Sequence, residues 1–374
     1  MAGREVLVTG GAGFVGSHLV DALRERGDRV RILDGLDPQV HPGGRRPAWV
    51  PADAEMLEAD VRDPAAVRSA LEGMEVVYHL AAAVGVGQSM YQVADYTAVN
   101  TLGTGHLLQA LVDRRGKVGR VVVASSMSIY GEGRYRRPDG SPPAAVVRAP
   151  DRLRAQAWEP RDADGAVLEP APTDEGKALD PTSIYALTKA DQEKMVLMVG
   201  AAYGIPSVAL RFFNIYGPRQ ALSNPYTGVA AIFSARLLNG QPPMIYEDGG
   251  QKRDFVSVHD VVQALLLAAD EDAAAGKAFN VGSGRAVTVR EVAATLAGVL
   301  GSEVEPQVTG KWRVGDIRHC FADISLAREV LGYEPRVTFE AGMEELVGWL
   351  REQERPEDRV DAHVAELAAR GLAL

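Results

Sequence analysis

The sequence predicts an α/β protein in which a doubly wound parallel sheet is completed by a smaller α/β lobe near the carboxyl terminus. Three observations support this fold class. Near the amino terminus a short apolar strand runs directly into a glycine-rich turn and a helix. Further apolar strands end in small or polar residues, and the chain of 374 residues, 46% of them hydrophobic, can bury the core of two lobes.

The overall composition limits the possible partners and compartments. A formal charge of −10 argues against nucleic acid or an anionic membrane surface as a bulk partner. Cys320 is the only cysteine, which excludes an internal disulfide, and no His or Asp cluster has metal-ligand spacing, so we expect no metal. No apolar run reaches membrane-spanning length, and the first strand leaves no room for a signal peptide before it, so we expect a cytoplasmic protein.

The first strand, residues 6–8, leads into the turn Gly10-Gly-Ala-Gly13-Phe14-Val15-Gly16 and a helix. Such glycines allow a pyrophosphate to approach the backbone, and the helix amino terminus offers free N–H groups. A second strand, residues 30–33, ends at Asp34, 18 residues beyond Gly16, where a carboxylate can accept hydrogen bonds from a ribose diol. The pattern favours a dinucleotide over a structural turn, and Asp34 favours NAD over NADP because it would repel a 2′-phosphate.

Two later segments extend this cofactor site. Asp60 and Val61 suit the edge and the face of an adenine. A further strand ends in Leu80, Ala81 and Ala82, where the backbone can pass close to a cofactor, although small residues there serve packing equally well.

The candidate catalytic residues follow a strand and begin a helix. The strand 121–124 ends in two serines at the carboxyl edge of the sheet, where a hydroxyl can hold a sugar oxygen or cap the next turn. Tyr185 and Lys189 are four residues apart, so on a helix they share one face. An ammonium near a phenol lowers the pKa of the phenol, which predicts that Tyr185 is a general base. The pair alone recurs by chance, so its neighbours must support it.

Six motifs occur in order, and together they resemble the extended short-chain dehydrogenase/reductase family in its nucleotide-sugar epimerase and dehydratase branch. They are Thr9-Gly-Gly-Ala-Gly-Phe-Val-Gly16, Asp60-Val61, His79-Leu-Ala-Ala82, Asn100, Ser125-Ser126-Met-Ser-Ile-Tyr130-Gly and Tyr185-x-x-x-Lys189. The resemblance runs from about residue 5 to residue 350. It implies a Rossmann-type NAD-binding domain over residues 1–210 and a mainly nucleotide-sugar-binding lobe over residues 211–374, some segments of which return to the first domain.

The resemblance also implies roles for individual residues. It makes Ser126, Tyr185 and Lys189 the catalytic set. The residues expected at NAD are Gly10, Gly13, Phe14, Val15, Gly16, Asp34, Asp60, Val61, Leu80, Ala81, Ala82, Asn100, Tyr185, Lys189 and Phe213. Those expected at the sugar nucleotide are Val84, Ser126, Met127, Ser128, Tyr185, Asn214, Asn224, Tyr246, Arg253 and Arg318.

Several of these substrate residues carry their own chemical argument. The loop at Asn224 opens a helix that can meet phosphate, and Tyr246 with its apolar neighbour can sandwich a pyrimidine. Arg253 and Arg318 are expected to clamp a diphosphate, which answers how an acidic protein binds an anion. Relatives usually dimerise through the helix after Asn100 and the Tyr185 helix, so the resemblance implies a homodimer.

Met127 and Ser128 favour one reaction within this branch. Relatives that dehydrate the sugar carry Asp-Glu at these two positions, and decarboxylating relatives usually keep the second carboxylate. Without a carboxylate the site can remove and return a hydride but lacks the groups for elimination. We therefore expect a 4-epimerase in which Tyr185 takes the 4-hydroxyl proton, NAD takes the C4 hydride, and the 4-keto sugar turns over before the hydride returns.

The substrate is predicted less narrowly than the reaction. Residues 84–89, 126–128 and 220–228 resemble those of bacterial 4-epimerases of dTDP-L-rhamnose and related 6-deoxysugars. UDP-glucose 4-epimerase is the next alternative. A decarboxylase or dehydratase with a relocated acid, and a non-catalytic dinucleotide sensor, also remain open.

An insert rich in Pro and Arg, residues 132–172, is longer than in most of the family. It contains seven prolines between Pro138 and Pro172. A structureless loop of this length is uncommon in a compact fold. We favour a solvated surface excursion over a lid whose arginines approach the substrate, although Trp158 and residues 166–168 indicate that part of it packs down.

Overall fold

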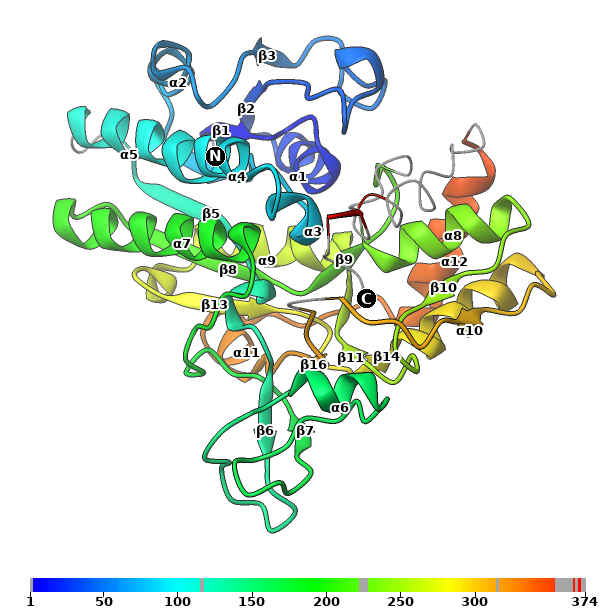
Figure 1. The fold of residues 1–374 in the computed structure, drawn as a ribbon. Helices are drawn as coiled ribbons and strands as arrows, with labels where there is room; N and C mark the ends of the chain where they lie inside the picture. Colours follow the sequence, from blue (N-terminus) through cyan, green and yellow to red (C-terminus); the bar gives the residue numbers. More distant parts are fainter. Residues whose placement is uncertain are drawn as a thin grey trace.

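The computed structural model describes residues 3–114, 118–221, 228–313, 316–353, 366 and 369–370. A seven-stranded parallel sheet forms its centre, in the order β13-β8-β5-β4-β1-β2-β3 (Figure 1). The chain builds β2 and β3 on one side of β1 and then crosses to build β4, β5, β8 and β13 on the other, which confirms the predicted doubly wound sheet. The strands are β1 (Glu5–Thr9), β2 (Arg29–Asp34), β3 (Glu55–Glu58), β4 (Val76–His79), β5 (Arg120–Ser126), β8 (Ser207–Phe212) and β13 (Ala278–Val281).

Helices cover both faces of this sheet. The middle residues of the central strands are mostly apolar because both faces of the sheet are buried. One face packs on α1 (Phe14–Glu25), α9 (Val258–Asp270) and α11 (Ser325–Leu331), and the other on α2 (Pro64–Ala70), α5 (Gly103–Asp113) and α7 (Ile184–Tyr203). Since α9, β13 and α11 follow residue 210, the carboxyl-terminal part of the chain contributes to this layer.

The start of α7 is fixed by local capping. The side chain of Ser183 accepts a hydrogen bond from the backbone N–H of Ala186, and the helix ends at Gly204 in the left-handed region. The backbone N–H of Tyr185 also donates to the Ser89 hydroxyl, at 2.9 Å. The first turn of α7 is therefore held at a defined position beside the carboxyl ends of the strands.

The second lobe, at the right of Figure 1, has its own core. It is formed by α8 (Val229–Leu238), α10 (Val289–Leu300) and α12 (Phe339–Arg351). Three small sheets connect it to the first lobe. They comprise β9 (Asn214–Tyr216) with β12 (Phe255–Ser257), β10 (Met244–Ile245) with β15 (Gln307–Val308), and β14 (Val287–Thr288) with β11 (Lys252–Arg253) and β16 (His319–Cys320).

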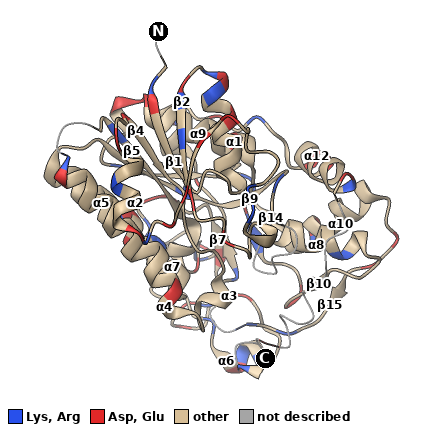
Figure 2. Cartoon of the chain, turned by 90° about the horizontal axis from the view of Figure 1, so that it is seen from above, with Lys and Arg blue, Asp and Glu red and all other residues tan. Residues whose placement is uncertain are grey.

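Short helical segments join the main elements. A π-helical segment, η2 (Thr97–Leu102), precedes α5, and a 3₁₀ turn, η3 (Met127–Tyr130), follows β5. The others are η1 (Pro42–Gly44), α3 (Val86–Ser89), α4 (Val93–Tyr96) and η4 (Asp272–Ala274). Acidic and basic residues are interspersed on both lobes (Figure 2). Within the described ranges, no helix has the length and apolar character needed to cross a bilayer.

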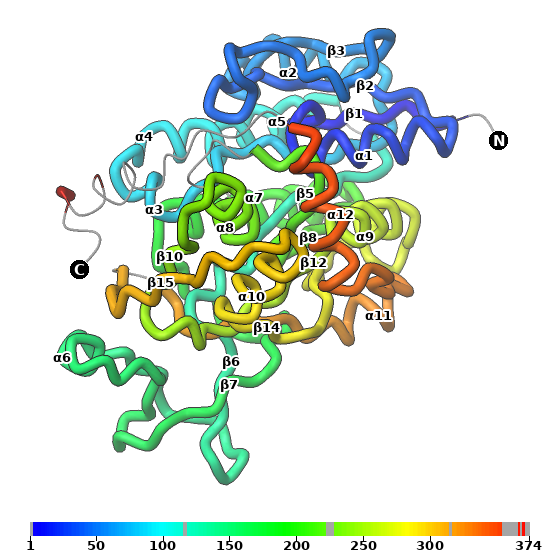
Figure 3. The backbone as a smooth tube through the Cα atoms, turned by 90° about the vertical axis from the view of Figure 1, so that its right-hand side faces the viewer, coloured from blue at the N-terminus to red at the C-terminus, as the bar shows by residue number. Residues whose placement is uncertain are grey.

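The insert projects from the body as a surface excursion, and it has secondary structure of its own. Its hairpin of β6 (Arg134–Arg136) and β7 (Glu169–Ala171) projects from the body at the bottom of Figures 1 and 3, and α6 (Pro150–Arg154) lies between these strands in the sequence. Leu153, Trp158 and Leu168 are buried, as Trp158 and residues 166–168 led us to expect.

Polar contacts replace a large apolar core inside the insert. The guanidinium of Arg137 donates to the carboxylates of Asp162 and Asp164. One oxygen of Asp162 also accepts hydrogen bonds from the backbone N–H groups of Ala144 and Ala145, both at 3.0 Å. This single buried carboxylate therefore joins three parts of the insert.

We expect Asp162→Ala to loosen the insert while leaving the central sheet folded, because the change leaves buried N–H groups without acceptors. Limited trypsin digestion should then cut the insert several times faster than in the unchanged protein. Asp139→Ala is the matched control, since Asp139 bonds only within its own turn, to Ser141. Equal cleavage rates for Asp162→Ala and the unchanged protein would contradict this account.

Candidate active site

The glycine turn between β1 and α1 is shaped by close backbone packing. Gly10 has φ +72°, and a Cβ at this position would lie 2.8 Å from the backbone nitrogen of Ala81. A Cβ on Gly16 would lie 2.1 Å from the Gly10 carbonyl oxygen. At Gly13, by contrast, the described residues leave space, with the Gly10 carbonyl oxygen as the close neighbour at 3.3 Å. No side chain caps α1, so its first amides are available to an anion such as a pyrophosphate.

Asp34 ends β2 beside this turn. Its carboxylate accepts hydrogen bonds from the backbone N–H groups of Ala12 at 3.0 Å and Leu36 at 2.9 Å. His41, which the sequence analysis missed, places Nε2 3.8 Å from Asp34 Oδ1 and is buried. Burial lowers the pKa of His41, and its Nδ1 has no partner within the described part of the chain. The arrangement fits a ribose held at the end of β2.

Three other residues predicted to contact the cofactor lie after β3 and β4. They are Asp60, Val61 and Leu80. Asp60 is half-buried and pairs with Arg62 at 2.7 Å, while Val61 packs against the start of α5 at Gly103. Leu80 donates its backbone N–H to the Thr9 carbonyl, which fixes the chain after β4 beside β1.

Asn100 ties the end of β4 to the catalytic helix. Its Oδ1 accepts the backbone N–H of Ala83 at 2.8 Å, and its Nδ2 donates to the Ala83 carbonyl at 3.1 Å and to the Thr188 hydroxyl at 3.0 Å. The residue is fully buried within η2, and such π-helical turns occur often at functional sites. Asn100 therefore positions backbone next to α7.

Ser126, Tyr185 and Lys189 come from two neighbouring elements, the end of β5 and the first turns of α7. Ser126 Oγ accepts from the backbone N–H and the hydroxyl of Ser128, at 3.2 and 2.9 Å. Burial raises the pKa of Tyr185, and a hydrogen bond with the Ser126 hydroxyl works in the opposite direction. The structure thus brings the predicted serine and tyrosine into contact.

In this structure burial dominates and the pKa of Tyr185 is raised, so the lowering of that pKa by Lys189 stays a prediction. Lys189 is itself buried, and burial lowers its own pKa to about 7, although Glu193 partly opposes this shift. The lysine Nζ donates to Gln192 Oε1 at 2.6 Å. Because both catalytic groups are removed from water, the charged form of each is disfavoured.

Gln192 is a functional residue that the sequence analysis missed. Its Nε2 donates to the Thr104 hydroxyl at 2.8 Å. That hydroxyl lies 2.9 Å from His79 Nε2, and His79 Nδ1 lies 2.8 Å from the Thr9 hydroxyl. Burial and the nearby lysine lower the pKa of His79 to about 3, so its ring is neutral. The spacing of three residues between Lys189 and Gln192 on one helix could have indicated this contact.

A second buried network separates the roles of the two serines that end β5. Ser125 donates to Glu193 Oε2 at 2.7 Å, and Arg211 donates to Glu193 Oε1 at 2.6 Å. Arg211 also donates to the hydroxyl of Tyr130, which in turn donates to Asn280. Ser125 is therefore part of the structural support beneath the site, and Ser126 is the serine that faces Tyr185.

Several buried polar side-chain atoms of the second half of the chain lack a partner among the described residues. Asn214 Oδ1, Gln220 Oε1 and Gln251 Oε1 are buried and lack a hydrogen-bond partner among the described residues, as does Arg313 Nε. The Arg313 guanidinium lies 4.1 Å from the ring centroid of Tyr246. Buried polar groups normally have partners, so this set fits a polar ligand. Arg313 was missed because a single arginine in a loop gives no sequence pattern.

Arg253 and Arg318, which are predicted to clamp a diphosphate, both bond to protein groups in this structure. Arg318 is 2% exposed, and its guanidinium pairs with Glu159 at 2.7 Å, Glu247 at 2.9 Å and Asp248 at 2.7 Å. Arg253 donates to the backbone carbonyls of residues 317 and 318 at 2.7 and 2.8 Å. Three carboxylates therefore neutralise the charge of Arg318. Arg253 stabilises the loop at residues 317 and 318 through their backbone carbonyls.

The remaining predicted substrate residues differ in exposure. Met127 is buried, whereas Val84 is 51% exposed before α3. Phe213, which is expected at NAD, is buried too. Asn224 lies outside the described residues.

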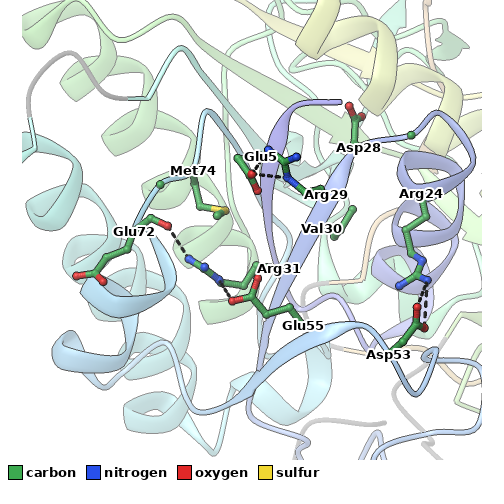
Figure 4. Close-up of a pocket in the computed structure, with 12 residues that line it drawn as sticks. Glu5, Arg24, Asp28, Arg29, Val30, Arg31, Asp53, Glu55, Glu72 and Met74 are labelled. Carbon is green, nitrogen blue, oxygen red and sulfur yellow. Dashed lines mark hydrogen bonds and ion pairs between the residues drawn. The ribbon is translucent and has the colours of Figure 1, made fainter. Parts of the chain in front are cut away.

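A hollow of about 780 Å³ lies at the opposite, amino-terminal ends of β1 and β2 (Figure 4). Its charged residues pair with one another, as Arg24 does with Asp53, Arg29 with Glu5 and Arg31 with Glu55. None of the predicted site residues lines it.

Comparison with known proteins agrees with this geometry. Residues 6–147 and 163–282 match the model of the NAD dependent epimerase/dehydratase family. The chain belongs to this family. The glycine turn, Asp34 and the orphaned nitrogen of His41 fit its cofactor, NAD, and Gly10, Gly13 and Asp34 are the residues that would hold it.

Relatives of this enzyme match along nearly the whole chain. A dTDP-L-rhamnose 4-epimerase of Burkholderia thailandensis is 36% identical, covering 94% of this chain and 96% of its own. A UDP-glucose 4-epimerase of Thermotoga maritima, solved with UDP-glucose, is 31% identical with a TM-score of 0.77, covering 93% of this chain and 99% of its own. A Thermus thermophilus UDP-glucose 4-epimerase, solved with NAD, is 32% identical with a TM-score of 0.74, covering 94% of this chain and 100% of its own.

The contact between Lys189 and Gln192 generates a pH prediction. Gln192→Glu would place a carboxylate where Gln192 Oε1 now lies, so the charged lysine should gain a partner and its pKa should rise above about 7. The ¹³Cε shift of Lys189, followed against pH in labelled enzyme, measures this directly. Gln192→Met is the control and should not raise the pKa. A pKa that is unchanged in Gln192→Glu would show that the glutamine does not control the lysine.

Proposed function

We propose that the enzyme inverts C4 of a nucleoside-diphosphate hexose through a transient 4-keto sugar. The observation that carries the proposal is the contact of Ser126 with Tyr185 beside Met127 and Ser128, two positions without a carboxylate. The site therefore holds one proton-transfer group at C4 and lacks an acid and base for loss of water.

In this mechanism Tyr185 is the proton carrier. Its phenolate accepts the proton of the 4-hydroxyl as C4 is oxidised, and the phenol gives a proton back to the 4-oxygen when C4 is reduced. NAD, when bound, supplies the reversible acceptor for the C4 hydride. The Ser126 hydroxyl orients the 4-oxygen and favours the phenolate against the effect of burial.

Lys189 stands one turn along α7 from Tyr185. Its buried ammonium group is held by Gln192, and its pKa near about 7 means that it can carry charge at neutral pH. A positive charge at this place favours a phenolate in the water-poor site. Between oxidation and reduction the sugar must rotate, so the proposal needs firm contacts to the nucleotide and weaker ones to the hexose.

For the substrate we propose a dTDP-linked 6-deoxyhexose such as dTDP-L-rhamnose. The apolar side chains of Met127 and Val84 suit a methyl group at C6. The 36% identity to a dTDP-L-rhamnose 4-epimerase over 94% of the chain supports the same choice. UDP-glucose and UDP-galactose are the alternative substrates, as the Thermotoga maritima relative was solved with UDP-glucose.

A decarboxylase or 4,6-dehydratase needs a relocated acid, and Glu132 is the carboxylate that follows η3. Its oxygens accept hydrogen bonds from the Tyr135 hydroxyl and from the backbone N–H of Arg318, both at 2.7 Å. Burial and the nearby Glu132 carboxylate raise the pKa of Tyr135, so this phenol remains a donor to Glu132. Glu132 is thus engaged in the structure of the loop, which favours the epimerase.

The proposed assembly is a cytoplasmic homodimer. Leu102, Leu187 and Met198 are 53%, 47% and 68% exposed on η2 and α7. Apolar side chains this exposed are suited to a partner helix. A reducing compartment suits the buried free thiol of Cys320.

We expect Tyr185→Phe to reduce kcat by about 10²- to 10⁴-fold, since it removes the proton carrier but not the bulk of the ring. Nuclear magnetic resonance of dTDP- and UDP-hexoses incubated with each variant reports C4 configuration through the ring couplings. Tyr203→Phe, at the other end of α7, is the control and should keep full activity. A Tyr185→Phe enzyme as active as the original, or release of water or carbon dioxide from any sugar, would rule out this function.

A further inference from the structure

One part of the insert lies outside the family match yet contacts the substrate lobe. The match stops at residue 147 and resumes at residue 163. Between these limits, Arg148 and Glu159 reach two segments of the lobe, residues 246–248 and 316–319. The segment outside the family match therefore docks on the lobe, as do Glu132 and Tyr135 at the start of the insert.

Arg148 joins the two segments to each other. Its Nη2 donates to Glu247 Oε1 at 2.5 Å, and its Nη1 donates to the backbone carbonyl of Asp316 at 2.9 Å. A planar guanidinium can hold both acceptors at once, whereas the single ammonium of a lysine cannot span them in this geometry.

Glu159 completes the connection from the other side. Its Oε1 accepts from Arg318 Nη2 at 2.7 Å, and its Oε2 lies 2.9 Å from His319 Nε2. Arg318 also donates to Glu247 Oε2 at 2.9 Å. Arg148, Glu247, Arg318 and Glu159 thus form a continuous chain of ion pairs that begins and ends in the insert.

This chain of ion pairs is mostly shielded from water. The side chains of Arg148, Glu247 and Arg318 are 10%, 3% and 2% exposed. Glu159 is 41% exposed, and Arg148 Nε has no hydrogen-bond partner among the described residues. The other buried charges are held by their ion pairs, so the network admits few alternative geometries. Burial would raise the pKa of Glu159, but hydrogen bonds from His319 and Arg318 outweigh this effect and lower the pKa to about 2. The Glu159 carboxylate is therefore charged at neutral pH.

The network fixes a strained residue beside the predicted base-binding tyrosine. Glu247 has φ +54°, a left-handed conformation that a residue with a side chain keeps only when its surroundings impose it. Its neighbour Tyr246 carries the Arg313 guanidinium on its ring, and the backbone N–H of Glu247 donates to the Lys311 carbonyl at 2.7 Å. If Arg148 and Arg318 no longer held the Glu247 carboxylate, the backbone at Glu247 would relax. Tyr246 and Arg313 would then both move.

We propose that Arg148 and Glu159 are positioning residues for nucleotide binding, through which the insert holds Tyr246 and Arg313 in place. The proposal rests on the function above, because it assigns Tyr246 and Arg313 to the nucleotide of a sugar-nucleotide substrate. It gives the insert a role in affinity for the substrate and none in the chemical step at C4.

Two substitutions test the network from its two ends. Glu159→Gln removes the charge that faces Arg318, and Arg148→Lys keeps its charge but loses the span between Glu247 and Asp316. Calorimetric titration with UDP and with dTDP should show affinity weakened on the order of tenfold in each variant. With the sugar nucleotide that is turned over, KM should rise by the same factor while kcat stays within about twofold. Glu159→Asp should restore much of the affinity.

Glu169→Gln is the matched control in the insert. Glu169 forms an exposed pair with Arg136 in the hairpin and faces away from the lobe's network, so nucleotide affinity should not change. Circular dichroism and bound NAD content check that each variant is folded. If Glu159→Gln does not fold, Arg148→Lys decides the question.

The outcomes separate this inference from the proposed reaction. Unchanged nucleotide affinity in folded Glu159→Gln and Arg148→Lys, or a fall in kcat without a change in KM, would overturn the inference even if C4 is inverted. Weakened nucleotide affinity in a protein that inverts no hexose would support the inference and refute the epimerase. A protein that binds neither UDP nor dTDP would refute both.

Discussion

The structure depends on one costly feature, a lysine ammonium buried at the carboxyl edge of a parallel sheet. Lys189 is 3% exposed, and water cannot solvate its charge. The surrounding fold compensates with a chain of hydrogen bonds that starts at Gln192 and continues through Thr104 and His79 to Thr9 on β1. The position of the lysine is thus tied to the first strand, and the cofactor cradle and the catalytic helix are fixed relative to each other.

Other buried polar side chains around the site are also stabilised by hydrogen bonds. Asn100 connects the end of β4 to α7, and Glu193 gathers Ser125 and Arg211 beneath the ends of β5 and β8. Each of these buried polar groups is satisfied by side chains from other elements. Ser126 and Tyr185 can then meet at an edge where the backbone has little freedom to move.

The glycine turn, the doubly wound parallel sheet and the motifs with the serine, tyrosine and lysine could be predicted from the sequence, because each has a local pattern. The spacing of Gln192 and Lys189 on α7 indicates their contact only weakly, and the place of His41 beside Asp34 depends on how the loop after β2 folds. The carboxylates around Arg318 could not be predicted for a related reason. A sequence shows that an arginine is present, but Glu159, Glu247 and Asp248 come from distant segments, and only the fold shows that they surround it.

The central claim is that C4 of a sugar nucleotide is oxidised and reduced at Tyr185, and isotopic labelling tests it most directly. The enzyme would be incubated with dTDP-L-rhamnose that carries deuterium at C4, and the product examined by nuclear magnetic resonance. Removal and return of a hydride predicts inverted configuration at C4 with the deuterium retained on that carbon. Inversion with loss of the deuterium to solvent, or no inversion of this sugar or of UDP-glucose, would contradict the account.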